Sequence, residues 1–253
     1  MPGDEALVPE AVVRVLTWNL KWATRTSARG RALRQRIVAE RPSIVCLTET
    51  YDDFLGDTGF TVTAGSDWGY PRPGGRRKVV LWSQRPFSSA DVLGDEELPP
   101  GRFVAAVTET DLGPVHCLGV CVSWRDAHVR TGKANKSQWQ DHVSFLHALQ
   151  RVLEAPRGGP VLLLGDFNQT LPRSRAPEAV HRALSEAIEA RLVIATAGLR
   201  AADGRLAIDH IAHSSELAAT KEESLSSATE DGELSDHFGV FASLTEASVG
   251  ARP

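Results

Sequence analysis

Residues 161–168, which read VLLLGDFN, restrict the fold of this chain more than any other segment. Four consecutive apolar residues, bounded by Pro160 and Gly165, predict a short strand that is buried on both faces. Asp166 and Asn168 follow at its end, and residues two positions apart on an extended backbone project to the same side. The alternative is an Asx-type turn, in which both side chains bind only the local backbone. The segment therefore predicts a buried strand that either delivers two polar groups to one pocket or ends in a turn.

The other apolar segments predict more strands than helices. Short turn-rich connections, such as residues 111–114, favour antiparallel pairing with helices packed outside the sheets. We expect strands at residues 11–18, 44–48, 60–64, 78–82, 103–110, 115–124, 161–164, 205–212 and 238–244, helices at 27–40, 138–153 and 177–190, and a loop or edge strand at 220–232. No repeat or linker divides the chain. We expect one domain over residues 11–246, with flexible tails at 1–10 and 247–253.

Composition places the chain among ordinary globular proteins. It has 253 residues, of which 42% are hydrophobic and 24% charged, enough for one large domain. No apolar run approaches the roughly 20 residues that a membrane helix needs, and the N-terminus lacks the pattern of a signal peptide. The sequence therefore predicts no membrane span and a cytoplasmic location.

Charge and cysteine content narrow the chemistry. The formal net charge of −4 is unusual for a protein that binds duplex nucleic acid tightly and without specificity, so any anionic substrate would be held by local basic patches. Cys46, Cys117 and Cys121 lie in apolar, strand-like runs, which favours buried free thiols over a disulfide or a zinc site.

Polar side chains recur at the ends of predicted strands. Asn19 and Glu49 each follow an apolar strand, Asp209 interrupts one, and Asp236 and His237 precede another. Each residue taken alone is typical of a turn or of a satisfied, partly buried side chain. Taken together, carboxylates and carboxamides at strand ends suit a divalent cation that prefers oxygen ligands, such as Mg²⁺, better than zinc.

The order and spacing of these motifs resemble the endonuclease/exonuclease/phosphatase superfamily. The matching segments are residues 17–19 (TWN), 47–49 (LTE), 165–168 (GDFN), 208–210 (IDH) and 235–237 (SDH). The resemblance implies an α+β fold, a four-layer α/β/β/α sandwich of two packed mixed, mostly antiparallel sheets. It also implies a metal-dependent phosphoesterase with its site at one edge of the sheets.

The resemblance implies four catalytic residues. Asp166 would orient or deprotonate the attacking water, and Asn168 would hold the phosphate or that water. Asp209 would accept a hydrogen bond from His237, which would face the scissile phosphate.

The resemblance also implies the metal ligands. Glu49 would be the main ligand of Mg²⁺, for which Mn²⁺ could substitute, with Asn19 beside it and Asp236 as a second carboxylate. His210 occupies a position where the family often has tyrosine, and we expect it to be structural.

One position departs from the family pattern. Many members have a histidine or tyrosine where this chain has Ser123, and a serine cannot act as a cation. Arg125 or His128 could fill the gap, although a solvated basic loop is an equally good interpretation. The predicted substrate-binding residues are Ser123, Arg102, Arg125, His128 and Arg173.

Three functions follow from these residues. The first is an Mg²⁺-dependent phosphodiester hydrolase, a nuclease, whose partner is a nucleic acid. The second is a phosphatase or phosphodiesterase on a small-molecule or lipid-derived phosphoester, favoured by the acidic net charge. The third is a non-catalytic binding member, suggested by Ser123. No obligate protein partner is predicted, and the sequence leaves open the phosphoester cleaved, endo or exo action and the oligomeric state.

Overall fold

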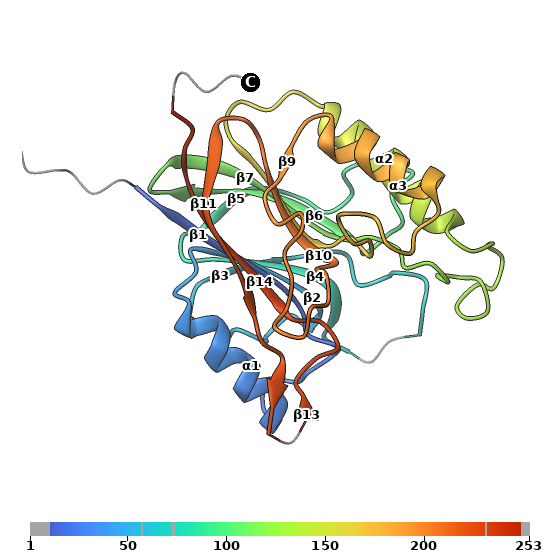
Figure 1. The fold of residues 1–253 in the computed structure, drawn as a ribbon, viewed down its shortest axis with the longest axis horizontal. Coiled ribbons are helices and arrows are strands. Elements are labelled where there is room, and N and C mark those ends of the chain that lie inside the picture. Colours follow the sequence, from blue (N-terminus) through green and yellow to red (C-terminus); the bar gives the residue numbers. More distant parts are fainter. Residues whose placement is uncertain (1–10, 57, 72–73, 231, 249–253) are drawn as a thin grey trace, which may run out of the picture.

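Two six-stranded sheets pack face to face between two helical layers (Figure 1). The computed structural model describes residues 11–56, 58–71, 74–230 and 232–248. The expected tails are residues 1–10 and 247–253, and of these only residues 247 and 248 lie inside this range. The layers confirm the predicted α/β/β/α sandwich.

The first sheet has the strand order β11-β14-β1-β2-β4-β3. Its strands are β1 (Val13–Asn19), β2 (Ile44–Tyr51), β3 (Phe60–Thr63), β4 (Arg76–Ser83), β11 (Leu217–Leu225) and β14 (Gly239–Glu246). The pair β1–β2 is parallel and the other four pairs are antiparallel. Helix α1 (Ala28–Ala39) connects β1 to β2 and covers the outer face, as a parallel crossover requires.

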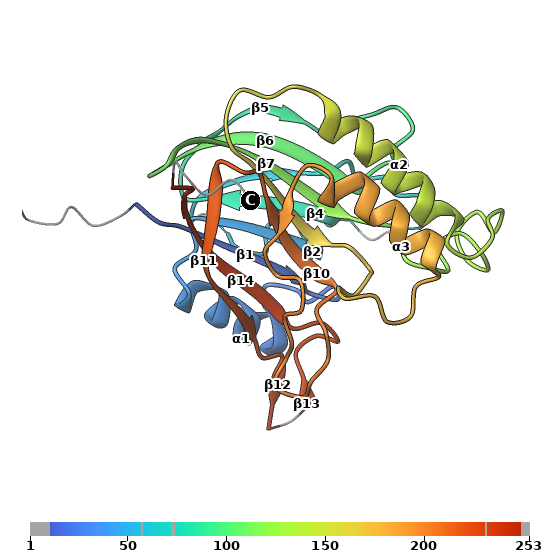
Figure 2. The ribbon, with the colours of Figure 1, turned by 45° about the horizontal axis from the view of Figure 1, so that its top comes forward.

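The second sheet has the strand order β5-β6-β7-β8-β10-β9. Its strands are β5 (Phe87–Asp91), β6 (Phe103–Thr110), β7 (Gly113–Cys121), β8 (Val161–Asp166), β9 (Val193–Ile194) and β10 (Asp209–His213). Here β7–β8 is the parallel pair, connected through α2 (Gln140–Glu154). Figure 2 shows α2 and α3 (Glu178–Leu184) on the outer face of this sheet. A π-helical turn (Ser185–Glu189) continues α3, and a small hairpin, β12 (Ala228–Thr229) with β13 (Gly232–Glu233), lies apart from both sheets.

Three apolar clusters fill the three spaces between layers. The inter-sheet cluster includes Val15, Cys46, Val79, Leu164 and Val240. A second joins α2, α3 and the π-helical turn to the second sheet, and a third joins α1 to the first sheet. All three cysteines are buried and free, as predicted. Among the described residues, no helix is long and apolar enough to cross a membrane.

Some elements differ from their predicted extent. The strand expected at residues 205–212 begins only at Asp209, and residues 217–225 form an edge strand of nine residues. Strand β5 was not predicted because its sequence, FSSAD, has no apolar alternation and four of its five residues are exposed. Ser27 caps α1, accepting a hydrogen bond from the Gly30 backbone N–H at 3.0 Å.

Gly165 brings β8 against β7 at the end of the opening segment. Its φ is +140°, and an added Cβ would lie 1.9 Å from the carbonyl oxygen of Val120. We expect Gly165→Ala to lower the free energy of unfolding by at least about 1 kcal/mol, because the added Cβ would overlap the Val120 carbonyl and the backbone is left-handed. Urea denaturation would measure the loss. Gly158→Ala is the matched control, because no atom lies within 4 Å of its added Cβ. Equal midpoints for the two variants would contradict this prediction.

Candidate active site

The two sheets meet at one edge through a hydrogen bond between strand ends. Asn19 at the end of β1 donates from Nδ2 to Oδ2 of Asp166 at the end of β8, at 3.2 Å. Asp166 lies directly opposite Asp209 in the antiparallel pair β8–β10. Directly paired residues have neighbouring side chains, so the strand pairing itself places two carboxylates side by side.

Asp166 is a buried carboxylate with a fixed orientation. Its Oδ1 accepts the backbone N–H of Asn168 at 2.9 Å. Burial, and then the nearby charge of Asp209, raise the pKa of Asp166 well above its ordinary value. Asn168 has a left-handed backbone (φ +53°), and its Nδ2 donates to the carbonyl of Val122 at 2.9 Å. The carboxamide oxygen of Asn168 is therefore available to the pocket that this residue lines.

Asp209 and His237 form a close pair, with His237 Nδ1 2.5 Å from Asp209 Oδ2. Burial alone would lower the pKa of His237, but the charges of Asp209 and Asp166 raise it well above its ordinary value. The backbone is held by Trp18, whose indole Nε1 donates to the His237 carbonyl at 3.1 Å. The raised pKa favours the imidazolium form of His237, and the contact with Asp209 orients the ring through Nδ1.

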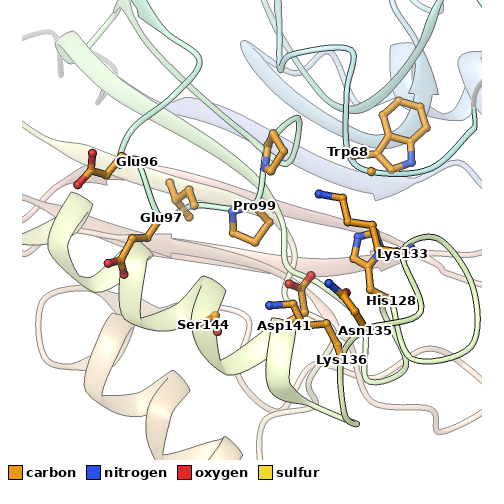
Figure 3. A pocket seen from close by; sticks show the side chains of 13 residues that line it. Trp68, Glu96, Glu97, Pro99, His128, Lys133, Asn135, Lys136, Asp141 and Ser144 are labelled. Carbon is orange, nitrogen blue, oxygen red and sulfur yellow. The ribbon is translucent and has the colours of Figure 1, made fainter.

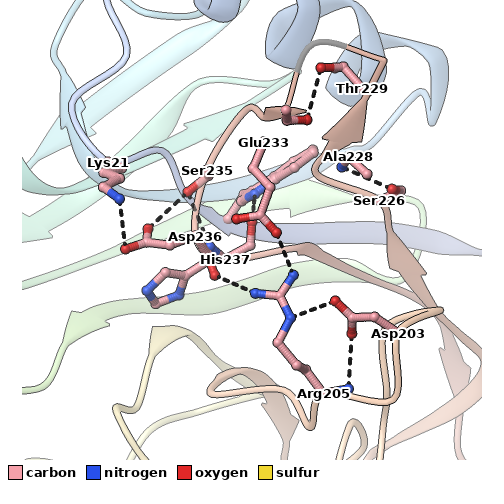
Figure 4. Close-up of polar contacts among 12 residues, drawn as sticks. Lys21, Asp203, Arg205, Ser226, Ala228, Thr229, Glu233, Ser235, Asp236 and His237 are labelled. Atoms are coloured by element: carbon pink, nitrogen blue, oxygen red, sulfur yellow. Dashed lines mark hydrogen bonds and ion pairs between the residues drawn. The ribbon is translucent and has the colours of Figure 1, made fainter.

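The two carboxylates predicted to bind metal each contact a lysine. Glu49 Oε1 lies 2.6 Å from Lys78 Nζ. Asp236 Oδ2 lies 3.1 Å from Lys21 Nζ, a contact that Figure 4 shows. Partial burial would raise the pKa of Asp236, but the contact with Lys21 lowers it below its ordinary value. Asn19 is also anchored here, because its Oδ1 accepts the backbone N–H of Lys21 at 2.9 Å.

The donor set fits a hard divalent cation. Among the described residues, Asp166, Asp209 and His237 have possible ligand atoms within 4.8 Å of one another. A protonated imidazole has no lone pair for a metal, so this group offers its carboxylate oxygens. Oδ1 of Asp209 is buried and without a hydrogen-bond partner. Carboxylate and carboxamide oxygens are the ligands that Mg²⁺ and Mn²⁺ prefer.

A pocket of about 630 Å³ opens over this edge. Asn168, Asp209 and His237 line its polar side, and Trp124 and Trp139 line another part of it. Its arginines are mostly paired: Arg125 with Asp126, Arg205 with Asp203 and Glu233, and Arg200 with the carbonyl of Gly204. Arg175 is exposed and has no such partner among the described residues.

The predicted substrate-binding residues are not gathered in one place. Arg125 lines the pocket of about 630 Å³. His128 lines a neighbouring cavity of about 470 Å³ (Figure 3), stacks on Tyr70 at 4.5 Å and has its pKa lowered, mainly by burial. Arg173 donates to the carbonyl of Ala176.

Ser123 and Arg102 are buried away from solvent. Ser123 Oγ donates to Asp141 Oδ2 at 2.7 Å, and its carbonyl lies 2.6 Å from Nδ1 of His142. Arg102 is 1% exposed and donates to the carbonyl of Cys121 at 3.3 Å. Neither residue lines the pocket above Asp209 and His237. His210 is fully buried, with Nε2 3.1 Å from the Gln169 carbonyl, as a structural residue would be.

Several residues at this edge were not singled out from the sequence. In the sequence, Lys78 follows two arginines, and Trp139 lies in the helix expected at residues 138–153, so neither stands out as a site residue. Lys78 contacts Glu49 because β2 pairs with β4. A local sequence pattern does not indicate which strands pair, so this contact could not be predicted. Lys21 could have been suspected, since it follows Asn19 by two residues.

Comparisons with known proteins give one family and structures that share this fold. The model of the endonuclease/exonuclease/phosphatase family matches residues 16–237. Similar solved structures include a humanized D. rerio TDP2 (15% identity, TM-score 0.68, 92% of this chain and 99% of that one). They also include the 3′ phosphatase NExo from Neisseria bound to a product DNA hairpin (17%, 0.67, 91% and 98%) and sphingomyelinase C from Streptomyces griseocarneus (15%, 0.61, 92% and 99%). No curated protein matches the chain.

Proposed function

This chain belongs to the endonuclease/exonuclease/phosphatase family, and from that premise we propose that it is an Mg²⁺-dependent phosphodiester hydrolase acting on nucleic acid. The observation that carries the proposal is the assembly of Asp166, Asp209 and His237 at the edge where the two sheets meet. A buried carboxylate of raised pKa, Asp166, next to a second carboxylate and an oriented imidazolium supplies the groups that in-line hydrolysis of a phosphodiester needs.

The proposed mechanism divides the work between three side chains. Asp166, held by Asn19 and by the Asn168 backbone, accepts a proton from the attacking water, and its raised pKa suits it to that role. The His237 imidazolium, fixed by Asp209, offsets the negative charge that develops on the phosphoryl oxygens.

Glu49, Asn19 and Asp236 are the proposed metal ligands. When bound, a divalent cation supplies Lewis-acid stabilisation of the phosphoryl group. The left-handed backbone of Glu49 (φ +46°) supports this assignment, because non-glycine residues in this conformation are uncommon and cluster at functional sites.

Two tryptophans favour nucleic acid as the substrate. Trp124 is 45% exposed and lines the same pocket as Trp139 and the unpartnered Arg175. Exposed aromatic rings next to cationic side chains stack on unpaired bases. The solved NExo structure, which shares the fold, holds a DNA hairpin.

We expect Trp124→Ala to raise KM for single-stranded DNA by roughly tenfold, because one base–aromatic stack is worth about 1–3 kcal/mol. The effect on a small aryl diester should be smaller. Phe60→Ala is the control, since Phe60 is an aromatic side chain of the same 45% exposure on β3. Similar KM values for Trp124→Ala and Phe60→Ala would contradict the stacking role.

A small-molecule or lipid-derived phosphoester is the second candidate. The observation in its favour is that three of the four arginines lining the pocket are already engaged by neighbouring carboxylates or a carbonyl. Little free positive charge then remains to follow a long phosphate backbone, in agreement with the net charge of −4. The non-catalytic alternative is the weakest, because the Asp166–Asp209–His237 group assembles without Ser123.

The test is metal-dependent hydrolysis of a series of substrates. An aryl phosphodiester, plasmid DNA, single-stranded DNA and a phosphocholine lipid would each be incubated with Mg²⁺, Mn²⁺ or EDTA. Cleavage of DNA with metal and not with EDTA would support the proposal. Cleavage of the aryl or lipid ester but not of DNA would favour the second candidate, and no turnover on any substrate would overturn both.

A further inference from the structure

Lys78 is the most buried lysine contact of the site. Its Nζ lies 2.6 Å from Glu49 Oε1, with 11% of the Lys78 side chain and 24% of the Glu49 side chain exposed. The pair Lys21–Asp236, by comparison, is 53% exposed on both sides. A partly buried ion pair is screened much less by salt than an exposed one, so the charge of Lys78 acts on Glu49 with little attenuation.

The backbone is shaped to make this contact. The register of β2 with β4 pairs Thr48 with Val79 and Thr50 with Arg77, and passes over Glu49 and Lys78 between them. Glu49 has a left-handed φ of +46° at this point. This irregularity allows the Glu49 carboxylate and the Lys78 ammonium to point toward each other, so the ion pair is a consequence of how β2 and β4 pair.

The charges at this edge are nearly balanced without any metal. Glu49 is paired with Lys78, Asp236 with Lys21 and Asp209 with His237. Asp166 has no lysine or arginine partner among the described residues. A divalent cation that approaches Glu49 therefore meets a carboxylate already neutralised by an ammonium at contact distance.

We propose that the Lys78 ammonium occupies the cation position at Glu49, so that a divalent ion binds only by displacing it and Lys78 sets the metal affinity of the site. The proposal rests on the metal role of Glu49 given above. Lysine has a flexible four-carbon stem that permits such movement. The ring of Trp22, whose centroid lies 5.3 Å from Nζ, offers the displaced ammonium a second partner.

Direct metal binding tests the competition. Titration calorimetry with Mn²⁺ alone would compare wild type, Lys78→Met and the control Lys221→Met, which removes a lysine from the surface pair with Glu223 on β11. We expect Lys78→Met to bind Mn²⁺ at least about tenfold more tightly. Lys221→Met should stay within about twofold of wild type, as expected for an exposed pair. An unchanged or weaker affinity in Lys78→Met would overturn the proposal.

A second measurement uses the unaltered protein, in case Lys78→Met does not fold. Lysine acylation followed by mass spectrometry would report the accessibility of Lys78 with and without Mn²⁺, with Lys221 as internal reference. We expect the labelling of Lys78 to rise on addition of Mn²⁺ while that of Lys221 stays constant. Unchanged or reduced labelling of Lys78 would overturn the proposal.

The results of these measurements distinguish a failure of the Lys78 proposal from a failure of the proposed function. Hydrolysis of phosphodiesters with Mg²⁺ could be observed even if the Lys78→Met affinity is unchanged, which would remove only the role of Lys78. Conversely, tighter Mn²⁺ binding by Lys78→Met without turnover on any substrate would keep the role of Lys78 and remove the proposed reaction.

Discussion

Asp166→Asn is expected to lower kcat for an aryl phosphodiester by about 10²–10⁴-fold, the usual contribution of a general base. The substitution keeps the shape of the side chain and an oxygen that can accept from Asn19 or from the Asn168 backbone. It removes the group that takes the proton. Steady-state kinetics with saturating metal would measure the loss, and Asp111→Asn, in the exposed turn between β6 and β7, is the control.

The same variant should be at least as stable as wild type. Asp166 is buried beside Asp209, and both burial and this neighbour disfavour its charged form. A neutral carboxamide relieves that repulsion, so thermal unfolding should occur at an equal or higher temperature. Activity above about one tenth of wild type in a folded Asp166→Asn protein lies outside the range expected for a lost general base and would remove Asp166 from this role.

His237→Ala is expected to cause the other large loss, again about 10²–10⁴-fold in kcat. The reason is different: the variant loses a positive charge aimed at the phosphate and leaves Asp209 buried without its partner. His116→Ala is the control, since His116 lies at the opposite end of the β7–β8 pair. Equal rates for His237→Ala and His116→Ala would contradict the assignment.

A double substitution separates the two members of this pair. If Asp209 acts by holding His237 as an imidazolium, Asp209→Asn should slow turnover on its own. Asp209→Asn combined with His237→Ala should then be no slower than His237→Ala, because residues that act as a unit are not additive. Fully additive losses would mean that Asp209 has a separate function.

The sequence predicted those parts of the site that lie at the ends of apolar strands. Residues 161–166 form the buried strand expected from their composition, with Asp166 at its end. Asn168 lies beyond the strand with a left-handed backbone, and its backbone N–H donates to Asp166 Oδ1, so the turn of the alternative interpretation also forms. The strand prediction was possible because a strand that is buried on both faces has a continuous run of apolar residues, which can be recognised in the sequence alone.

Contacts between strands that are distant in sequence could not be predicted in this way. The contact of Lys78 with Glu49 depends on which strand pairs with β2 and in which register. Ser123 was predicted to bind substrate, whereas its hydroxyl donates to Asp141 on α2, a partner set by the packing of that helix on the sheet. The role of the five predicted substrate-binding residues therefore stays a prediction. Of these five, Arg125 alone lines the pocket that contains Asp209 and His237.

The position of β14 between β1 and β11 has a consequence for how the enzyme is made. Asn19, Glu49 and Asp166 precede His237 in the chain, and the strand that follows His237 inserts between two strands that precede it. On the proposed mechanism, the imidazolium is therefore the last of these groups to join the site.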